Sequence, residues 1–330
     1  MRLTILKEFI ASESMAGFLL LAAAILAMVI DNSPWQHYYH DILHHKTSIH
    51  LGVLILSKSV HHWVNDGLMA IFFLLVGLEI KREFCEGHLA SFSGVLLPGI
   101  AAVGGMVVPA VIFLLWTWHD AVAMRGWAIP TATDIAFSLG ILSLLGSRVP
   151  LSLKVFLTAL AIFDDIGAIV IIAVFYTANV SLWLLLAVVI LLLVLFILNR
   201  SQVQYLVIYC LIGFVLWVCV LQSGVHATLA GIVLALMIPV ATKNTRQVSP
   251  LHRLEHLLHP WVTFVVLPLF AFTNAGVDFS QLSFSAMLNP ISIGIAAGLF
   301  IGKQLGVTLS VWLAVRSGLA KLPDQLSYMG

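Results

Sequence analysis

Ala159-Leu-Ala-Ile-Phe-Asp-Asp-Ile-Gly-Ala168 carries two adjacent aspartates, Asp164 and Asp165, about halfway along an apolar run over residues 151–176. A run of this length is enough to cross a bilayer, because a spanning helix needs about 20 mostly apolar residues. A carboxylate at mid-bilayer costs roughly 2.5–3.5 kcal/mol on insertion scales, so a chain keeps one only where it faces a cavity or a partner. The stretch therefore predicts a spanning helix that contains a functional site.

The composition of the whole chain agrees with a membrane protein. Hydrophobic residues make up 61% of the 330 residues and charged residues only 9%, whereas globular proteins carry about 25% charged residues. A soluble protein with so few charges would expose large apolar patches and aggregate. The net charge of +1 gives no reason to expect a nucleic-acid partner. We therefore expect an all-α polytopic membrane protein.

Ten apolar runs are long enough to span a bilayer, allowing for a few polar residues inside them. The first follows Arg2 and Lys7 but lacks a small-residue cleavage site, so we interpret it as a retained span rather than a signal peptide. The expected spans lie near 14–31, 60–80, 93–116, 126–146, 151–176, 182–199, 204–221, 223–241, 257–277 and 290–315.

The basic residues predict the orientation of these spans, since Lys and Arg are enriched in cytoplasmic loops. With the N-terminus in the cytoplasm, 12 of the 16 basic residues fall on the cytoplasmic side. They are Arg2, Lys7, Lys81, Arg82, Arg148, Lys154, Arg200, Lys243, Arg246, Arg253, Arg316 and Lys321. Lys46, Lys58 and Arg125 fall on the other side, and Lys303 lies inside a span. A cytoplasmic N-terminus is therefore expected.

The one sizeable outer loop covers residues 32–59. Within it, Ser48-Ile-His-Leu-Gly-Val-Leu-Ile-Leu-Ser57 contains a short alternating stretch, which predicts a small β-hairpin turning near Gly52. Histidines in or near this loop suit either zinc or copper binding or a wet loop that tolerates histidine. The second interpretation is favoured, because no partners that would orient ligating imidazoles are visible. These histidines are His37, His40, His44, His45, His61 and His62.

The adjacent aspartates favour competition between protons and a cation. Neighbouring positions on a helix lie about 100° apart, so one carboxylate can face a cavity while the other faces a helix. Two close carboxylates in a low dielectric cannot both ionise cheaply. A hard monovalent cation prefers several oxygens, and the same oxygens take up protons when it leaves. The alternative is a buried carboxylate paired with a lysine for packing alone.

Asp134 lies in Gly126-Trp-Ala-Ile-Pro-Thr-Ala-Thr-Asp-Ile-Ala-Phe-Ser-Leu-Gly140. Pro130 removes a helix hydrogen bond, and nearby threonine hydroxyls can satisfy the freed backbone groups. This composition predicts a helix interrupted at membrane depth, which is tolerated only beside a cavity or inside the protein. Asp134 would neutralise the positive N-terminal end of a half-helix. The alternative is a simple proline kink with a solvated aspartate.

Lys303 lies in a second glycine-rich span, Gly298-Leu-Phe-Ile-Gly-Lys-Gln-Leu-Gly306. It is expected to be a counter-charge to Asp164 or Asp165, or the partner of a half-helix C-terminus. The alternative is that its ammonium snorkels to the cytoplasmic interface.

A further set of charges is expected on the cytoplasmic side, where histidines beside carboxylates could couple activity to acidity. Solvated charges at helix ends are the ordinary alternative. The residues concerned are Glu79, Lys81, Arg82, Glu83 and Glu86 at the end of the second span, and Arg253, Glu255, His256 and His259 at the start of the ninth.

Two motifs, Ala161-Ile-Phe-Asp-Asp-Ile-Gly-Ala-Ile169 and Pro130-Thr-Ala-Thr-Asp-Ile-Ala-Phe137, make the sequence resemble the bacterial NhaA family of sodium/proton antiporters. That family is itself among the transporters described with inverted repeats and broken helices. The resemblance covers essentially the whole chain. It continues through Phe72-Phe-Leu-Leu-Val-Gly-Leu-Glu-Ile-Lys-Arg82, Gly224-Val-His-Ala-Thr-Leu-Ala-Gly231, Arg253-Leu-Glu-His-Leu-Leu-His-Pro260 and Leu267-Pro-Leu-Phe-Ala-Phe-Thr-Asn-Ala-Gly276.

The resemblance implies that Asp164 and Asp165 bind the cation and the protons, with Na⁺ as the bound metal ion. It also implies that Asp134 and Lys303 balance charges where two interrupted helices cross, beside Thr133. The residues that it ties to pH regulation in a cytoplasmic funnel are Glu79, Arg82, Glu255, His256 and His259.

At the level of the whole protein, the resemblance implies a single transporter domain over 1–330 with inverted-repeat architecture. The domain would exchange Na⁺ or Li⁺ for H⁺ electrogenically in a bacterial inner membrane. No enzymatic activity and no cofactor are expected. A homodimer through the periplasmic hairpin at 45–58 is expected, surrounded by membrane lipid.

Proteins of this family usually carry two more spans after the tenth, and this sequence ends at Leu326-Ser-Tyr-Met-Gly330, about where they should begin. We therefore expect the final two spans to be absent, and with them part of the electrostatic partner of Asp134 and Lys303. One alternative function is an inactive or regulatory truncated remnant. Another is an intramembrane aspartyl hydrolase that uses Asp134 and Asp164, but this chemistry leaves Asp165 and Lys303 unexplained.

Overall fold

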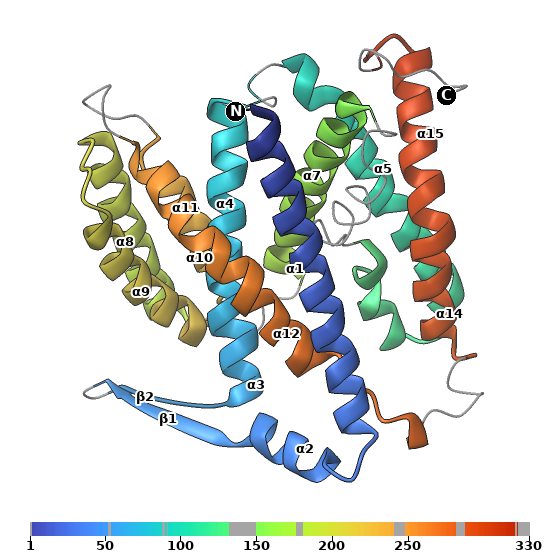
Figure 1. The fold of residues 1–330 in the computed structure, drawn as a ribbon, viewed down its shortest axis with the longest axis horizontal. Helices are drawn as coiled ribbons and strands as arrows, with labels where there is room; N and C mark the ends of the chain where they lie inside the picture. Colours follow the sequence, from blue (N-terminus) through green and yellow to red (C-terminus); the bar gives the residue numbers. More distant parts are fainter. Residues whose placement is uncertain are drawn as a thin grey trace. The chain divides into compact units, whose positions relative to one another are not determined.

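The computed structural model describes residues 2–51, 54–87, 90, 92–131, 150–175, 181–240, 248–281, 288–320 and 322. These residues are mostly helical and include one two-stranded antiparallel sheet (Figure 1). By length and composition, seven described helices could cross a membrane. An eighth is added if Met15–Asp31 and Gln36–His44, bent by 113°, count as one span. The predicted class of polytopic helical membrane protein is confirmed.

Two of the ten predicted spans have no such counterpart among the described residues. Most of 126–146 lies outside them. The predicted span 223–241 is wrong as a continuous span, because it contains only the nine-residue helix α10 (Leu229–Met237). Nine residues rise only about 14 Å, less than half of a bilayer core. Gly224 ends the preceding helix in the left-handed conformation with φ 84°, a backbone shape that favours glycine.

The chain divides into two compact units. The first contains residues 1–17, 86–172 and 280–330, and the second contains 18–85 and 173–279. The predicted single transporter domain over 1–330 stays a prediction. Three elements contribute residues to both units: α1 (Arg2–Asp31), α7 (Leu151–Phe175) and η7 (Phe279–Gln281).

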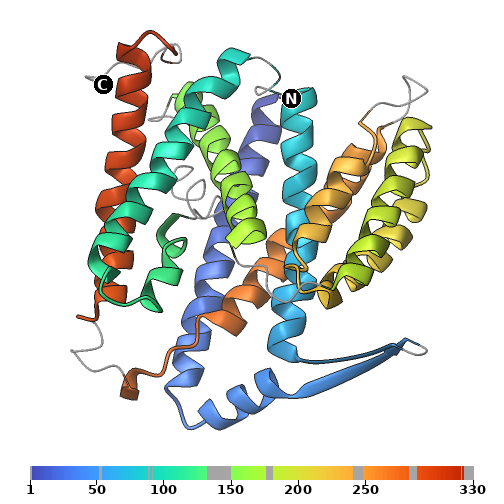
Figure 2. The ribbon, with the colours of Figure 1, turned by 180° about the vertical axis from the view of Figure 1, so that it is seen from behind.

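In the first unit, a continuous helical span from Pro290 to Arg316 packs along another span (Figure 2). The elements are α5 (Phe92–Thr117), the 3₁₀ turns η3 (Ala123–Gly126) and η4 (Ile129–Thr131), α14 (Pro290–Ala297), the π-helical turn η8 (Gly298–Gly302) and α15 (Lys303–Arg316). Small residues recur every four positions along the 290–316 span, which places them on one helix face. They are Gly294, Gly298, Gly302, Gly306 and Ser310.

This stripe of small residues lets two backbones approach closely, as is common between membrane helices. A Cβ added at Gly306 would lie 2.2 Å from the carbonyl oxygen of Gly104 on α5. A Cβ at Gly302 would lie 2.8 Å from the Cα atom of Pro109, and one at Gly298 would lie 2.8 Å from the Cβ atom of Pro130. In the first unit, the 290–316 span therefore approaches its neighbours so closely that a larger side chain at these glycines would clash.

The second unit is built around α4 (Met69–Cys85) and α10, which also meet through small residues. A Cβ at Gly231 would lie 2.1 Å from the carbonyl oxygen of Ala70. The unit also contains α2 (Gln36–His44), α3 (Val60–His62), the π-helical turn η1 (Trp63–Leu68), α8 (Leu182–Arg200), α9 (Leu206–Ser223), α11 (Pro250–Trp261), the π-helical turn η6 (Val262–Val266) and α12 (Leu267–Asn274). Its core includes the fully buried residues Leu78, Leu195, Tyr209, Ile238 and Leu251.

The predicted hairpin is confirmed. Strand β1 (Lys46–Leu51) pairs with β2 (Leu54–Ser59), in a register that sets Lys46 opposite Ser59 and Leu51 opposite Leu54. The predicted turn residue Gly52 lies outside the described residues. Helix α3 follows β2 directly, so the hairpin leads into a candidate span.

Replacing Gly306 by valine should lower the melting temperature of the purified protein. The new side chain would meet backbone rather than a movable side chain, and overpacking costs roughly 1–3 kcal/mol. Thermal unfolding in detergent measures the effect. Gly17→Ala is the control, because a Cβ at Gly17 meets nothing within 4 Å. An unchanged melting temperature for Gly306→Val would contradict the close packing of α5 and α15.

Candidate functional site: a buried aspartate–lysine pair

Asp164 is fully buried near the middle of α7. Its Oδ2 atom lies 2.7 Å from the Nζ atom of Lys303, whose side chain is 13% exposed. An isolated charge in such a place would be strongly disfavoured, whereas a hydrogen-bonded ion pair offsets much of the desolvation penalty. The geometry therefore joins two of the four ionisable residues that the sequence places well inside spans, which are Asp134, Asp164, Asp165 and Lys303.

Lys303 is positioned by the elements on either side of it. It is the first residue of α15 and follows the π-helical turn η8. Its ammonium also donates a hydrogen bond of 2.6 Å to the carbonyl oxygen of Thr131, the last residue of η4. Lys303 is thus a counter-charge to Asp164, one of the roles that the sequence offered, and it also bonds the backbone at Thr131. The alternative of a snorkelling lysine is wrong.

Asp165 follows Asp164 on α7 and is half-buried. Thr133 and Asp134 lie outside the described residues, so their expected place at a helix crossing stays a prediction. The 3₁₀ turn at Ile129–Thr131, which includes Pro130, is the last described part of that segment before Pro150. The described site is therefore Asp164, Lys303 and the carbonyl group of Thr131, with Asp165 adjacent in sequence.

A second charged cluster lies in the other unit, where α4 meets α11. A guanidinium nitrogen of Arg82 donates to Oε1 of Glu255, and another donates to Oε1 of Glu83 at 3.2 Å. Glu255 is buried. Glu79 and His259 are half-buried, whereas His256 is exposed. Of the residues expected to regulate the response to pH, the structure therefore joins Arg82 and Glu255 by a direct bond.

Lys81 has a position that the sequence did not predict. Its ammonium donates to the carbonyl oxygens of Leu236, at 2.7 Å, and Ile238. These carbonyls lie at the C-terminal end of α10, where the backbone oxygens lack partners within the helix and carry partial negative charge. The sequence carried no distinct signal for this contact, because a lysine at the end of a span is ordinarily interpreted as a solvated charge.

The histidines near the hairpin are not gathered around a common centre. Among the described residues there is no group of three or more His, Cys, Asp or Glu side chains that could hold a metal ion. His40 instead pairs with the buried carboxylate of Asp31 at 2.8 Å, and His61 contacts the Oδ1 atom of Asn274 at 3.1 Å. The described histidines therefore give the metal interpretation no support.

Together, these features define a polytopic helical membrane protein with an ionisable pair inside its spans. A family model described as Na+/H+ antiporter 1 matches residues 7–330. Over 326 residues the chain is 54% identical to "Na(+)/H(+) antiporter NhaA" of Sulfurovum sp. (strain NBC37-1), covering 98% of this chain and 83% of that relative.

Two further relatives carry the same name. The chain is 56% identical to the Rhodospirillum rubrum protein over 327 residues and 50% identical to the Proteus mirabilis protein over 323 residues. Both alignments cover 98% of this chain and 82% of the relative. The chain belongs to the Na+/H+ antiporter 1 family, and the resemblance inferred from its motifs is confirmed.

Replacing Lys303 by methionine should destabilise the protein by about 3–5 kcal/mol, because it leaves the buried carboxylate of Asp164 without its counter-charge. Adding Asp164→Asn should recover much of this loss, since the neutral amide needs no counter-charge. Denaturant or thermal unfolding of the two single variants and the double variant measures the coupling. Additive losses would show that the two side chains do not depend on each other.

Proposed function

We propose that this chain is a secondary transporter, not an enzyme, and that it exchanges cytoplasmic Na⁺ for external H⁺. The observation that carries the proposal is the fully buried Asp164 on a candidate span, bonded to Lys303 from another span. Relatives named as Na⁺/H⁺ antiporters, more than half identical over nearly the whole chain, support the same activity.

In the proposed mechanism, Na⁺, protons and the ammonium group of Lys303 compete for the carboxylate oxygens of Asp164 and Asp165. When the site holds no Na⁺, Lys303 and protons balance the negative charge. An entering Na⁺ displaces the protons and weakens the bond between Lys303 and Asp164, because two cations near one carboxylate repel each other. Protons from the other side then displace the Na⁺. Exchange is strict because all three cations need the same oxygens.

The finer features of the transporter are proposals of the same kind. Li⁺ would replace Na⁺, because it is also a hard monovalent cation that prefers oxygen. More protons than sodium ions would move in each cycle, which makes transport electrogenic. The excess of Lys and Arg on one side supports a cytoplasmic N-terminus and a location in the bacterial inner membrane. The hairpin of β1 and β2 would join two protomers.

We also propose that the Arg82–Glu255 cluster sets the pH at which transport starts. The bond links α4 to α11, and three histidines, His252, His256 and His259, lie on α11 within about one turn of Glu255. Protonation of His256 or His259 would change the charge beside this bond and so bias the positions of the two helices.

Asp164→Asn should abolish sodium-driven proton movement, because a neutral amide cannot exchange a proton for a cation. The assay uses the full chain in liposomes with an internal pH-sensitive dye and an imposed Na⁺ gradient. Asp41→Asn is the matched control, since Asp41 is 62% exposed and lies outside the spans in a surface pair with His37. Full activity of Asp164→Asn would rule out the proposed site.

Glu255→Gln should shift the pH of half-maximal transport without abolishing transport. Loss of the negative charge leaves the guanidinium of Arg82 without its partner on α11, so the charge beside the histidines changes and the midpoint should move. The measurement is the rate of sodium-driven proton movement between pH 6 and 9. Arg253→Gln, an exposed change on the same helix, is the control. A midpoint that moves equally in both variants would contradict a specific role for the Arg82–Glu255 bond.

A further inference from the structure

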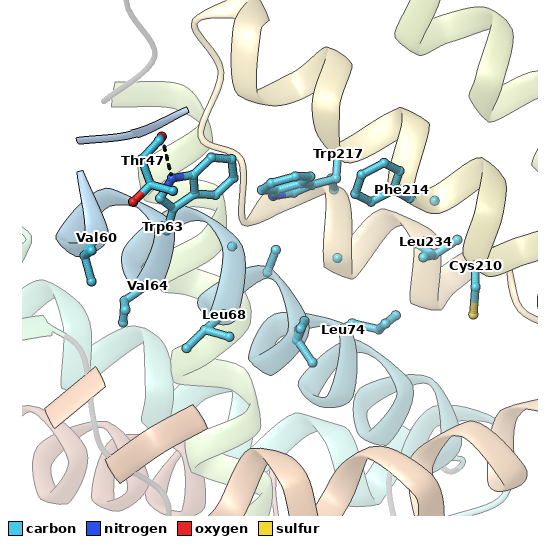
Figure 3. Close-up of a pocket in the computed structure, with 16 residues that line it drawn as sticks. Thr47, Val60, Trp63, Val64, Leu68, Leu74, Cys210, Phe214, Trp217 and Leu234 are labelled. Atoms are coloured by element: carbon cyan, nitrogen blue, oxygen red, sulfur yellow. Dashed lines mark hydrogen bonds between the residues drawn. The ribbon is translucent and has the colours of Figure 1, made fainter. Parts of the chain in front are cut away.

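An apolar groove in the second unit is separate from both charged clusters. It has a cavity volume of about 640 Å³ and lies between the span that begins at Val60 and the helices α9 and α10 (Figure 3). Its walls are almost entirely apolar. Trp63, Phe214 and Trp217 line one part of it, and Leu74, Cys210 and Leu234 line another.

The polar atoms of the two tryptophans are turned toward the backbone rather than the groove. The indole nitrogen of Trp63 donates to the carbonyl oxygen of Thr47 at 3.4 Å, and that of Trp217 donates to the carbonyl oxygen of Asp66 at 3.0 Å. The two rings lie 6.2 Å apart between centroids, tilted by 39°, and both line the groove. The groove therefore offers dispersion contacts and very few hydrogen bonds.

The elements around the groove place it against hydrocarbon. Helix α4 with its N-terminal turns, and helix α9, are both candidate spans. Ile71 and Phe214 line the groove and are 37% and 51% exposed, so the groove is open at the side where the bilayer lies. Its volume falls within the range of about 300–1,000 Å³ that is typical of sites for small molecules. Acyl chains of the surrounding bilayer are the most abundant apolar groups beside the groove.

The hairpin places a positive charge at the end of the groove. Thr47 lines that end, and Lys58 lies directly opposite Thr47 in the β1–β2 register, so both side chains are on the same face of the hairpin. Lys46 lies one position away from Thr47 and is therefore on the opposite face. A lysine beside an interfacial tryptophan suits the phosphate of a lipid headgroup, whose charge attracts basic side chains near the membrane surface.

We propose that this groove binds one anionic phospholipid, with an acyl chain between Trp63, Ile71 and Phe214 and the phosphate at Lys58. The polar end of the site is built by the hairpin, and the apolar end by α4, α9 and α10. Lipid binding here is independent of the exchange of ions at Asp164.

Native mass spectrometry of the full chain, released from detergent after titration with lipid, tests this assignment. The probes are phosphatidylglycerol and phosphatidylcholine with the same acyl chains. Lys58→Gln should weaken phosphatidylglycerol binding about five-fold, the contribution of one basic residue near an anionic surface. It should weaken phosphatidylcholine binding less, because the choline ammonium offsets the charge of the phosphate. Ile71→Trp fills the groove from a partly exposed position and should weaken both lipids. Lys46→Gln carries the same charge change on the opposite face and should bind as the unaltered chain does.

Equal losses for Lys58→Gln and Lys46→Gln would overturn the proposal, because they would show a general effect of hairpin charge. Unchanged lipid binding by Ile71→Trp, with a loss of dimers in the same spectra, would also overturn it and assign the groove to a second copy of the chain. Alkylation of Cys210, with Cys85 and Cys219 replaced by serine, is the second measurement. Phosphatidylglycerol should slow the alkylation of Cys210 when Ile71 is retained, but not when the chain also carries Ile71→Trp.

Discussion

A buried carboxylate inside a membrane span must have a positive partner, and the bond between Asp164 and Lys303 meets this requirement in the first unit. Neither charge is stable at that depth alone, so the two spans that carry them must stay close together. The ammonium is satisfied on a second side by the carbonyl group of Thr131. One lysine therefore joins three segments that are far apart in the sequence, and the contacts around Asp164 exist only while all three meet.

Close approach of the helices is the next condition, and the small residues of the 290–316 span provide it. Gly298, Gly302 and Gly306 bring the backbone of this span against Pro130, Pro109 and Gly104 in turn. Lys303 lies between the second and third of these glycines. Larger residues there would move the ammonium away from the carboxylate, because a backbone contact cannot give way as a flexible side chain does. The helix packing and the electrostatics of the site are therefore set by the same few residues.

Sequence reasoning located the charges but not all of their contacts. Asp164 and Lys303 could be identified because an ionisable residue inside an apolar run is costly wherever the chain folds. The hairpin could be predicted from its alternating stretch, and eight of the ten expected spans coincide with candidate spans or with the bent pair. The contact between Asp164 and Lys303 depends on helix rotation, which composition does not encode.

Other features could not be predicted from the sequence, and the reasons can be identified. The segment 223–241 is apolar throughout, so hydropathy alone could not show that Gly224 and the turn after it leave only a short helix, α10. The three π-helical turns in the described part of the chain have no residue signature, since the same apolar residues form α-helix elsewhere. The contacts of Lys81 could not be predicted, because its partners are backbone carbonyls, which every sequence contains.

Lys81 and Lys303 nonetheless make similar contacts, each within its own unit, because both ammonium groups donate to backbone carbonyl oxygens. Each extends from a spanning helix and donates to a backbone carbonyl oxygen, at the C-terminal end of α10 for Lys81 and at Thr131 for Lys303. The end of α10 carries partial negative charge, and backbone oxygens cannot rely on water in a membrane. The two lysines differ in their other contacts. Lys303 also bonds a carboxylate, so its hold on Thr131 depends on the charge at Asp164, whereas the described hydrogen bonds of Lys81 go to backbone alone. A change at Asp164 can therefore be transmitted to the backbone at Thr131, while the Lys81 contact is suited to hold α10 in place.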